Sequence, residues 1–110
     1  SPLEIYIEET EIIEITQTRV FVLDINGLRK DLQPGIYTIG RGTDVDIQIN
    51  DPGISRKHLS IQVNEKVTVT DLNSTNGTFL GTEKVTELLV EDSITFRVGV
   101  TEISIVSELR

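Results

Sequence analysis

Residues 59–71 read LSIQVNEKVTVTD, with apolar side chains at every second position on either side of a short polar break. The apolar positions of each half would share one face of a strand, because successive side chains of a strand point to opposite faces. Asn64 and Glu65, between the halves, can turn the chain. The segment therefore predicts two paired antiparallel strands with one face in a core.

The same alternation recurs along the chain in short runs that are broken by turn residues such as Asn26-Gly27, Pro34-Gly35 and Gly99. No window keeps a helical spacing for long. We therefore predict an all-β fold, a two-sheet antiparallel β-sandwich of about 10–11 short strands. The other predicted strands are residues 19–25, 28–32, 36–40, 46–49, 78–80, 87–90, 94–98 and 101–106.

We predict that residues 1–17 form an N-terminal extension of a domain that spans residues 18–108. Leu3, Ile5 and Ile7 alternate with polar or acidic neighbours, which predicts an added hairpin or edge strand. The alternative is a linker that is ordered only by contacts with a partner. Because the sequence contains no methionine, we expect it to be one module of a longer protein.

Composition narrows the class of protein. A length of 110 residues with 37% apolar residues suits one domain with a modest core. Without cysteine there is no disulfide, thiolate zinc site or cysteine nucleophile, which is compatible with a reducing, cytoplasmic (intracellular) setting. No apolar stretch is long enough for membrane insertion. The net charge of -8 disfavours nucleic acid as a partner.

Three polar islands stand apart from the strand pattern, and their chemistry is that of anion capture. A guanidinium grips a phosphate bidentately, hydroxyls donate hydrogen bonds, and an Asn-Gly loop exposes backbone and amide groups. A phosphorylated side chain is the natural guest of such groups. The islands are Gly40-Arg41, then Ser55-Arg56-Lys57-His58, then Ser74-Thr75-Asn76-Gly77.

The order of these islands resembles the forkhead-associated (FHA) family of phosphothreonine readers, over residues 18–107. The resemblance implies an FHA-type sandwich. It also implies that Arg41 holds the phosphate, that Ser55 donates its hydroxyl to a phosphate oxygen, and that Arg56 adds charge. Thr75 would lie near the phosphate, and Asn76 would reach the peptide backbone.

The resemblance gives other residues supporting roles. His58 would brace the loops through hydrogen bonds to backbone, and Gly40 and Gly77 would support the site, Gly77 through its backbone geometry. Lys57 would point toward solvent. A preference for the third residue after phosphothreonine would involve Gly53, Ile54 and loop residues 81–84.

The implied partner is a phosphothreonine-containing protein or peptide from a Ser/Thr kinase substrate system, with no cofactor and no metal. One alternative is an FHA-fold docking module that works without phosphate. A hydrolase triad of Ser55 and His58 with Asp51 or Asp71 has little support, because their spacing shows no bond between nucleophile and base. Ser55 as a turn cap and Asn76-Gly77 as a plain hairpin turn are the structural alternatives.

Thr10 lies among acidic residues, with Ile13 three positions after it. Its phosphorylation would create a ligand for the site of the same or a neighbouring molecule. The alternative is a turn residue of the N-terminal hairpin.

Overall fold

The computed structural model describes residues 2–7 and 11–110, so Thr10 lies outside the described residues. The described part is built from strands alone, which confirms the all-β prediction. The thirteen strands found there are β1 (Pro2–Ile7), β2 (Glu11–Thr16), β3 (Arg19–Ile25), β4 (Leu28–Leu32), β5 (Gly35–Gly40), β6 (Ile47–Gln48), β7 (Leu59–Val63), β8 (Val67–Asp71), β9 (Thr78–Leu80), β10 (Glu83–Val85), β11 (Glu87–Val90), β12 (Ser93–Val98) and β13 (Thr101–Leu109).

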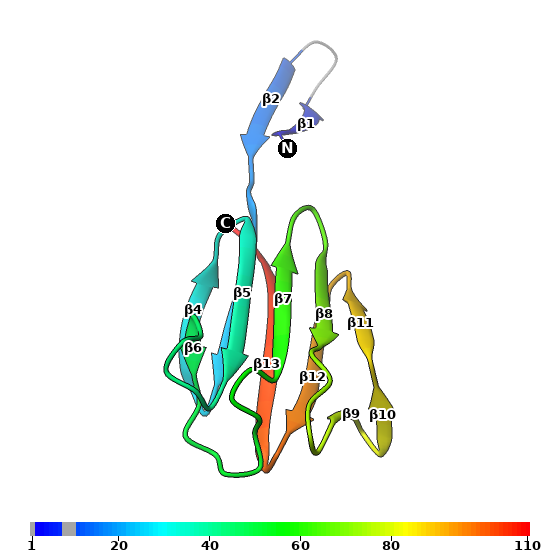
Figure 1. Ribbon diagram of the computed structural model, residues 1–110. Coiled ribbons are helices and arrows are strands. Elements are labelled where there is room, and N and C mark those ends of the chain that lie inside the picture. Colours follow the sequence, from blue (N-terminus) through cyan, green and yellow to red (C-terminus); the bar gives the residue numbers. More distant parts are fainter. Residues whose placement is uncertain (1, 8–10) are drawn as a thin grey trace.

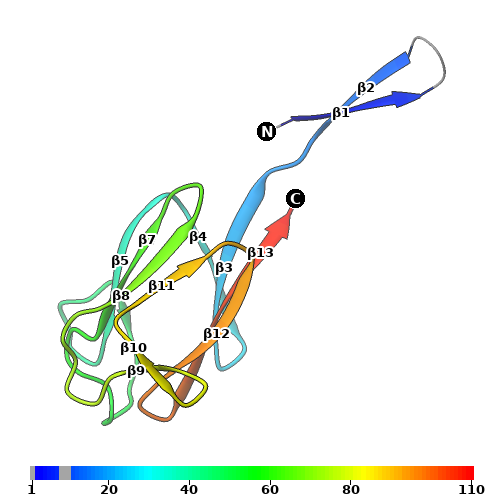
Figure 2. The same ribbon diagram turned by 90° about the vertical axis from the view of Figure 1, so that its right-hand side faces the viewer.

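Strands β3 to β13 form two sheets that pack face to face as a sandwich (Figures 1 and 2). One sheet has the order β10-β9-β12-β13-β3-β4, and the other has the order β11-β8-β7-β5-β6. Neighbouring strands run antiparallel, as predicted, except that β6 pairs with β5 in parallel through Ile39 and Ile47. This parallel pair forms because the chain crosses over between β5 and β6 instead of turning back in a hairpin.

Residues 59–71, which were predicted to form two paired strands, form the β7–β8 hairpin. The register of this hairpin pairs Ile61 with Val69 and Val63 with Val67. These four side chains are at most 2% exposed. They meet buried residues of the opposite sheet, among them Phe96 and Ile103, in one core. The period-2 alternation therefore predicted both the strands and the face that they bury.

One element was not predicted. Residues 81–84 were expected to be loop, but Glu83 and Lys84 belong to β10, which pairs with Leu80 and Phe79 of β9. The three residues of β10 are exposed or half-buried, so no apolar alternation marks the strand in the sequence. The expectation of a loop was wrong for these two residues.

Strands β1 and β2 pair with each other and form a separate two-stranded sheet. Figures 1 and 2 show this hairpin projecting beyond one end of the sandwich, near the C-terminus. The β5–β6, β6–β7 and β8–β9 connections lie at the opposite end. The described residues include no helix that is long and apolar enough to cross a membrane.

Candidate functional site

The three polar islands meet at the loop end of the sandwich and are joined by direct hydrogen bonds. The backbone N–H of Arg41 donates to the carbonyl of Ser55 at 2.9 Å. The N–H of Thr75 donates to Oγ of Ser55 at 2.9 Å, and Nδ2 of Asn76 donates to the carbonyl of Gly53 at 3.0 Å. Residues far apart in the sequence therefore form one continuous surface.

The side chain of Arg41 is held in a fixed direction. Its Nε–H donates to the carbonyl of Ile54 at 3.0 Å. Within the described residues its two terminal guanidinium nitrogens make no hydrogen bond, so they are available for an oxyanion. A hollow of about 750 Å³, called here the basic hollow, is lined by Arg41, Gly42, Thr43, Asp44, Arg56 and Lys57.

Three cations and one carboxylate line the basic hollow. Arg56 is exposed, and its side chain makes no hydrogen bond or ion pair among the described residues. Nζ of Lys57 lies 3.4 Å from Oδ2 of Asp44, and both side chains are more than half exposed. An exposed ion pair of this kind contributes about 0–1 kcal/mol. The hollow therefore keeps a positive excess that suits an anion.

Gly40 allows the first two islands to approach each other. A Cβ atom at this position would lie 1.9 Å from the carbonyl oxygen of Arg56. The N–H of Gly42 also donates to that oxygen, at 3.0 Å. Any larger residue at position 40 would push the strand carrying Arg41 away from the loop carrying Ser55.

His58 connects the second and third islands from inside the protein. Its ring is fully buried. Nδ1 accepts the N–H of Ser55 at 3.0 Å, so Nε2 carries the proton and donates to the carbonyl of Gly77, also at 3.0 Å. Because both ring nitrogens bond to backbone groups, His58 fixes the spacing between the loops.

The third island has its own internal support. The carboxylate of Asp71 accepts hydrogen bonds from the N–H and Oγ of Ser74 and from Oγ1 of Thr78, at 2.7–2.8 Å. Partial burial raises the pKa of Asp71, but the hydrogen bonds from Ser74 and Thr78 outweigh it and hold that pKa below its ordinary value. Gly77 closes the loop with a φ of 92°, a conformation that suits glycine.

This geometry bears on the triad alternative. The bond between Ser55 and His58 joins the backbone N–H of Ser55 to the ring, whereas Oγ of Ser55 accepts from Thr75. Both ring nitrogens of His58 already have partners. The ring therefore does not hold the serine hydroxyl as a general base would.

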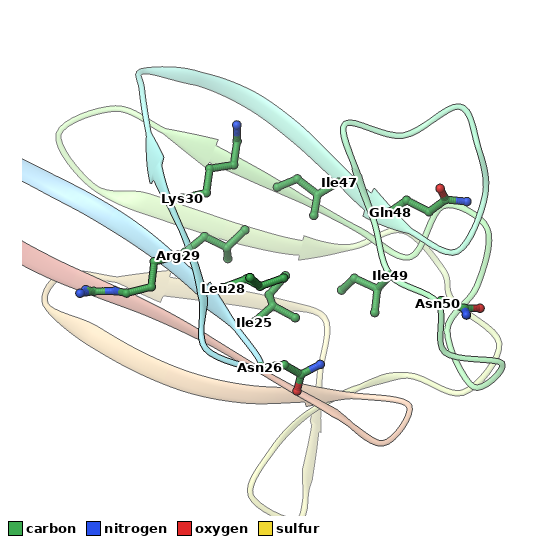
Figure 3. Close-up of a pocket in the computed structure, with 10 residues that line it drawn as sticks. Ile25, Asn26, Leu28, Arg29, Lys30, Ile47, Gln48, Ile49 and Asn50 are labelled. Atoms are coloured by element: carbon green, nitrogen blue, oxygen red, sulfur yellow. The ribbon is translucent and has the colours of Figure 1, made fainter.

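A second hollow of about 280 Å³ lies between the β3–β4 turn and β6. Figure 3 shows its side chains, with Ile25, Leu28, Ile47 and Ile49 gathered toward one another and Arg29 pointing away from them. Arg29 is engaged in an ion pair with Glu108. This hollow is mainly apolar and does not have the converging cations of the basic hollow.

Comparison with known proteins agrees with the family that the order of the three islands resembles. The family model of the FHA domain matches residues 37–99, which include all three islands. The chain belongs to the FHA domain family. This confirms the resemblance inferred from the order of the islands.

Individual relatives agree with this assignment. The FHA domain-containing protein FhaA of Mycobacterium tuberculosis is 40% identical over 81 residues, which cover 73% of this chain but only 15% of FhaA. A solved structure from an analysis of phosphothreonine-dependent FHA domain interactions has a TM-score of 0.73 and 34% identity, covering 78% of this FHA domain chain and 94% of the solved chain. The FhaA FHA domain, solved in complex with the intracellular domain of Rv3910, has a TM-score of 0.72 and 35% identity, covering 77% and 98%.

The structure places the predicted phosphate contacts Arg41, Ser55, Arg56 and Thr75 around one surface, with Asn76 at its border. Ile54, expected to help select the ligand, is only 1% exposed and lies in the core. That expectation was wrong for the side chain of Ile54. Lys57 reaches solvent but also lines the basic hollow, and the supporting carboxylate of Asp71 was not predicted.

Proposed function

We propose that this FHA domain is a phosphothreonine-dependent interaction module that binds phosphorylated peptides through its loops. The observation that supports it most is Arg41, which lines the basic hollow and whose Nε–H is bonded to the carbonyl of Ile54, while its terminal nitrogens make no hydrogen bond among the described residues. A phosphothreonine carries a charge of about -1.5 to -2 and three acceptor oxygens. Charge-assisted hydrogen bonds to such a group are about twice as strong as neutral ones.

In this proposal Arg41 and Arg56 supply charge to the phosphate. Ser55 donates its hydroxyl, which is free to do so because its Oγ so far only accepts from Thr75. Thr75 adds a hydroxyl, and Asn76 bonds to the backbone of the ligand. Gly40, His58 and Gly77 hold the loops at the required spacing without contacting the ligand.

The proposal extends to the setting of the module. The module is non-catalytic, and its partner is a protein that carries phosphothreonine and belongs to an intracellular Ser/Thr kinase substrate system. The solved relatives named above, one of them bound to an intracellular domain, support this setting by analogy.

The separation of the β1–β2 sheet from the sandwich supports dividing the chain into an extension, residues 1–17, and an FHA domain, residues 18–108. Thr18 and Arg110 pair through two backbone hydrogen bonds, which supports extending the end of the domain from residue 108 to Arg110. The projecting hairpin is also the feature that favours the second candidate function, docking without phosphate, because it offers a surface away from the loops.

Calorimetric titration tests the proposal. A degenerate phosphothreonine peptide pool and its unphosphorylated twin are titrated into the wild type, into Arg41→Ala and into Lys30→Ala. Lys30 is an exposed cation at the second hollow and serves as the matched control. We expect heat only with the phosphorylated pool, lost in Arg41→Ala and kept in Lys30→Ala. Equal or absent binding of both pools would shift the case to phosphate-independent docking.

A further inference from the structure

Asp51 is a buried carboxylate in the loop between β6 and β7, and within the described part of the chain its side chain forms no hydrogen bond or ion pair with the three islands. It is only 4% exposed. Its Oδ1 accepts the N–H of Gly53 at 2.8 Å. Its Oδ2 accepts the N–H of Val100 at 2.9 Å and Oγ1 of Thr101 at 2.7 Å. Three donors therefore converge on one side chain.

These hydrogen bonds join the two sheets at the loop end. Gly53 belongs to a loop of the β5–β6–β7 sheet, whereas Val100 lies in the β12–β13 turn and Thr101 begins β13 of the other sheet. Val100 and Thr101 lie 49 and 50 positions after Asp51 in the sequence. The contact is tight as well. A Cβ on Gly99 would lie 2.5 Å from Oδ2 of Asp51. The β12–β13 turn thus forms a fixed base for the β6–β7 loop.

The loop held in this way carries the two carbonyls that orient the site. The carbonyl of Gly53 accepts Nδ2 of Asn76, and the carbonyl of Ile54 accepts Nε of Arg41. The backbone of Asp51 reinforces the arrangement, because its carbonyl accepts the N–H of Ile54 at 3.0 Å. Gly53 and Ile54, the two loop residues that bond to Asp51, are therefore each one hydrogen bond away from Asn76 and Arg41.

We propose that Asp51 is a positioning residue of the phosphopeptide site, which sets the directions of Arg41 and Asn76 by fixing the carbonyls of Gly53 and Ile54. The inference rests on the proposed function for its ligand. Its physical basis is that two loop carbonyls keep their directions only while the backbone between them is held. Asp51 holds that backbone through its bonds to Val100 and Thr101 of the opposite sheet.

A carboxylate is required because all three partners donate. An ionised carboxylate has two acceptor oxygens, whereas an asparagine amide has one acceptor oxygen and two N–H donors. In Asp51→Asn, the NH₂ group would face at least one N–H or O–H donor without forming a bond. The substitution keeps the size of the side chain, so it tests the hydrogen bonds rather than the packing.

The experiment uses the full chain and three variants. Asp51→Asn replaces one of the two acceptor oxygens with an NH₂ donor. Thr101→Val removes one donor from the far sheet and keeps the carboxylate. Val63→Ala is the matched control, since Val63 is a core residue, 2% exposed, at the end of β7 that meets the β7–β8 turn, away from the loops. For each variant, Tm, phosphothreonine-peptide affinity, and the NMR signals of Arg41 Nε–H and the Asn76 side-chain amide are measured.

For Asp51→Asn we expect affinity to fall by about tenfold or more, as for the loss of one charge-assisted hydrogen bond. The Arg41 and Asn76 signals should move to the positions of free side chains, already in the protein without ligand. Thr101→Val should show smaller changes in affinity and in the two signals. This variant still tests the inference if Asp51→Asn does not fold. Val63→Ala should lower Tm and leave affinity and both signals in place.

Two results would overturn the inference. The first is that the Arg41 and Asn76 signals are unchanged in a folded Asp51→Asn or Thr101→Val variant. The second is that these variants lose no more affinity than Val63→Ala does at the same loss of Tm. If the wild type binds no phosphopeptide, the proposed function fails. The NMR signals of the free protein still decide whether Asp51 orients the two side chains.

Discussion

Replacing His58 with alanine should destabilise the domain strongly, because the imidazole joins two loops inside the protein. The ring is fully buried and satisfies the N–H of Ser55 and the carbonyl of Gly77. In His58→Ala both backbone groups would be left without a partner. The structure thus predicts a folding defect at a position whose neighbours, Arg56 and Lys57, are exposed.

The expected size follows from the two groups. A buried polar group without a hydrogen bond costs about 1–3 kcal/mol, so the pair costs about 2–6 kcal/mol, and the lost packing adds to this. We expect the free energy of unfolding to fall by about 4 kcal/mol. With a typical urea dependence of about 2 kcal/mol per molar, the midpoint of unfolding would move by roughly 2 M.

Urea titration followed by circular dichroism measures this shift. Lys66→Ala is the control, because Lys66 is a turn residue with a side chain 61% exposed. It should stay within about 0.5 kcal/mol of the wild type. A His58→Ala midpoint within about 0.5 M of the wild type would refute the reasoning, since it would mean that neither Ser55 nor Gly77 depends on the ring.

Two further predictions concern the loops. Gly40→Ala should abolish phosphopeptide binding, because its Cβ would overlap the carbonyl of Arg56. Gly27→Ala is the control: its φ of 83° makes an alanine strained, but its Cβ would meet no atom within 4 Å, so it should lower Tm and still bind. Calorimetry distinguishes the two, and normal binding by Gly40→Ala would contradict the close approach. The pKa of Asp51 is lowered by hydrogen bonds, first from Thr101 and then from Gly53, and that of Asp71 is also lowered. The two carboxylates should therefore stabilise the fold fully above the ordinary aspartate pKa of about 3.9, and this stabilisation should be lost as the pH falls through their lower pKa values in the folded protein. Measuring Tm from pH 7 to 2 checks this. A Tm that stays constant below pH 4 would contradict it.

Much of the fold was readable from the sequence because most core strands alternate strictly. Val67 and Val69 show the same period in sequence and in burial, so the sheet face follows directly. The strand β10 has no such signal, because Glu83 and Lys84 are exposed and their pairing depends on β9 alone. The parallel placement of β6 likewise depends on a crossover that two residues cannot encode locally.

The site was readable as a set of residue types, but its support was not. Arg41, Ser55 and Asn76 stand in polar islands that interrupt the strand pattern, and the structure joins them. Asp51 was considered only as a possible triad member, and its bonds to Val100 and Thr101 were not predicted, since these partners are about fifty positions away and no local pattern connects them. Long-range hydrogen bonds of this kind have no periodic trace in a sequence.

The bond from Arg41 Nε to the carbonyl of Ile54 has a consequence for the entropy and the rate of binding. A free arginine side chain loses rotamer freedom worth about 1.5–2 kcal/mol when it is fixed. Here much of that loss occurs during folding, before any ligand arrives. Association should then resemble the docking of two rigid bodies, with little rearrangement of the loops and a rate set by diffusion and electrostatic steering.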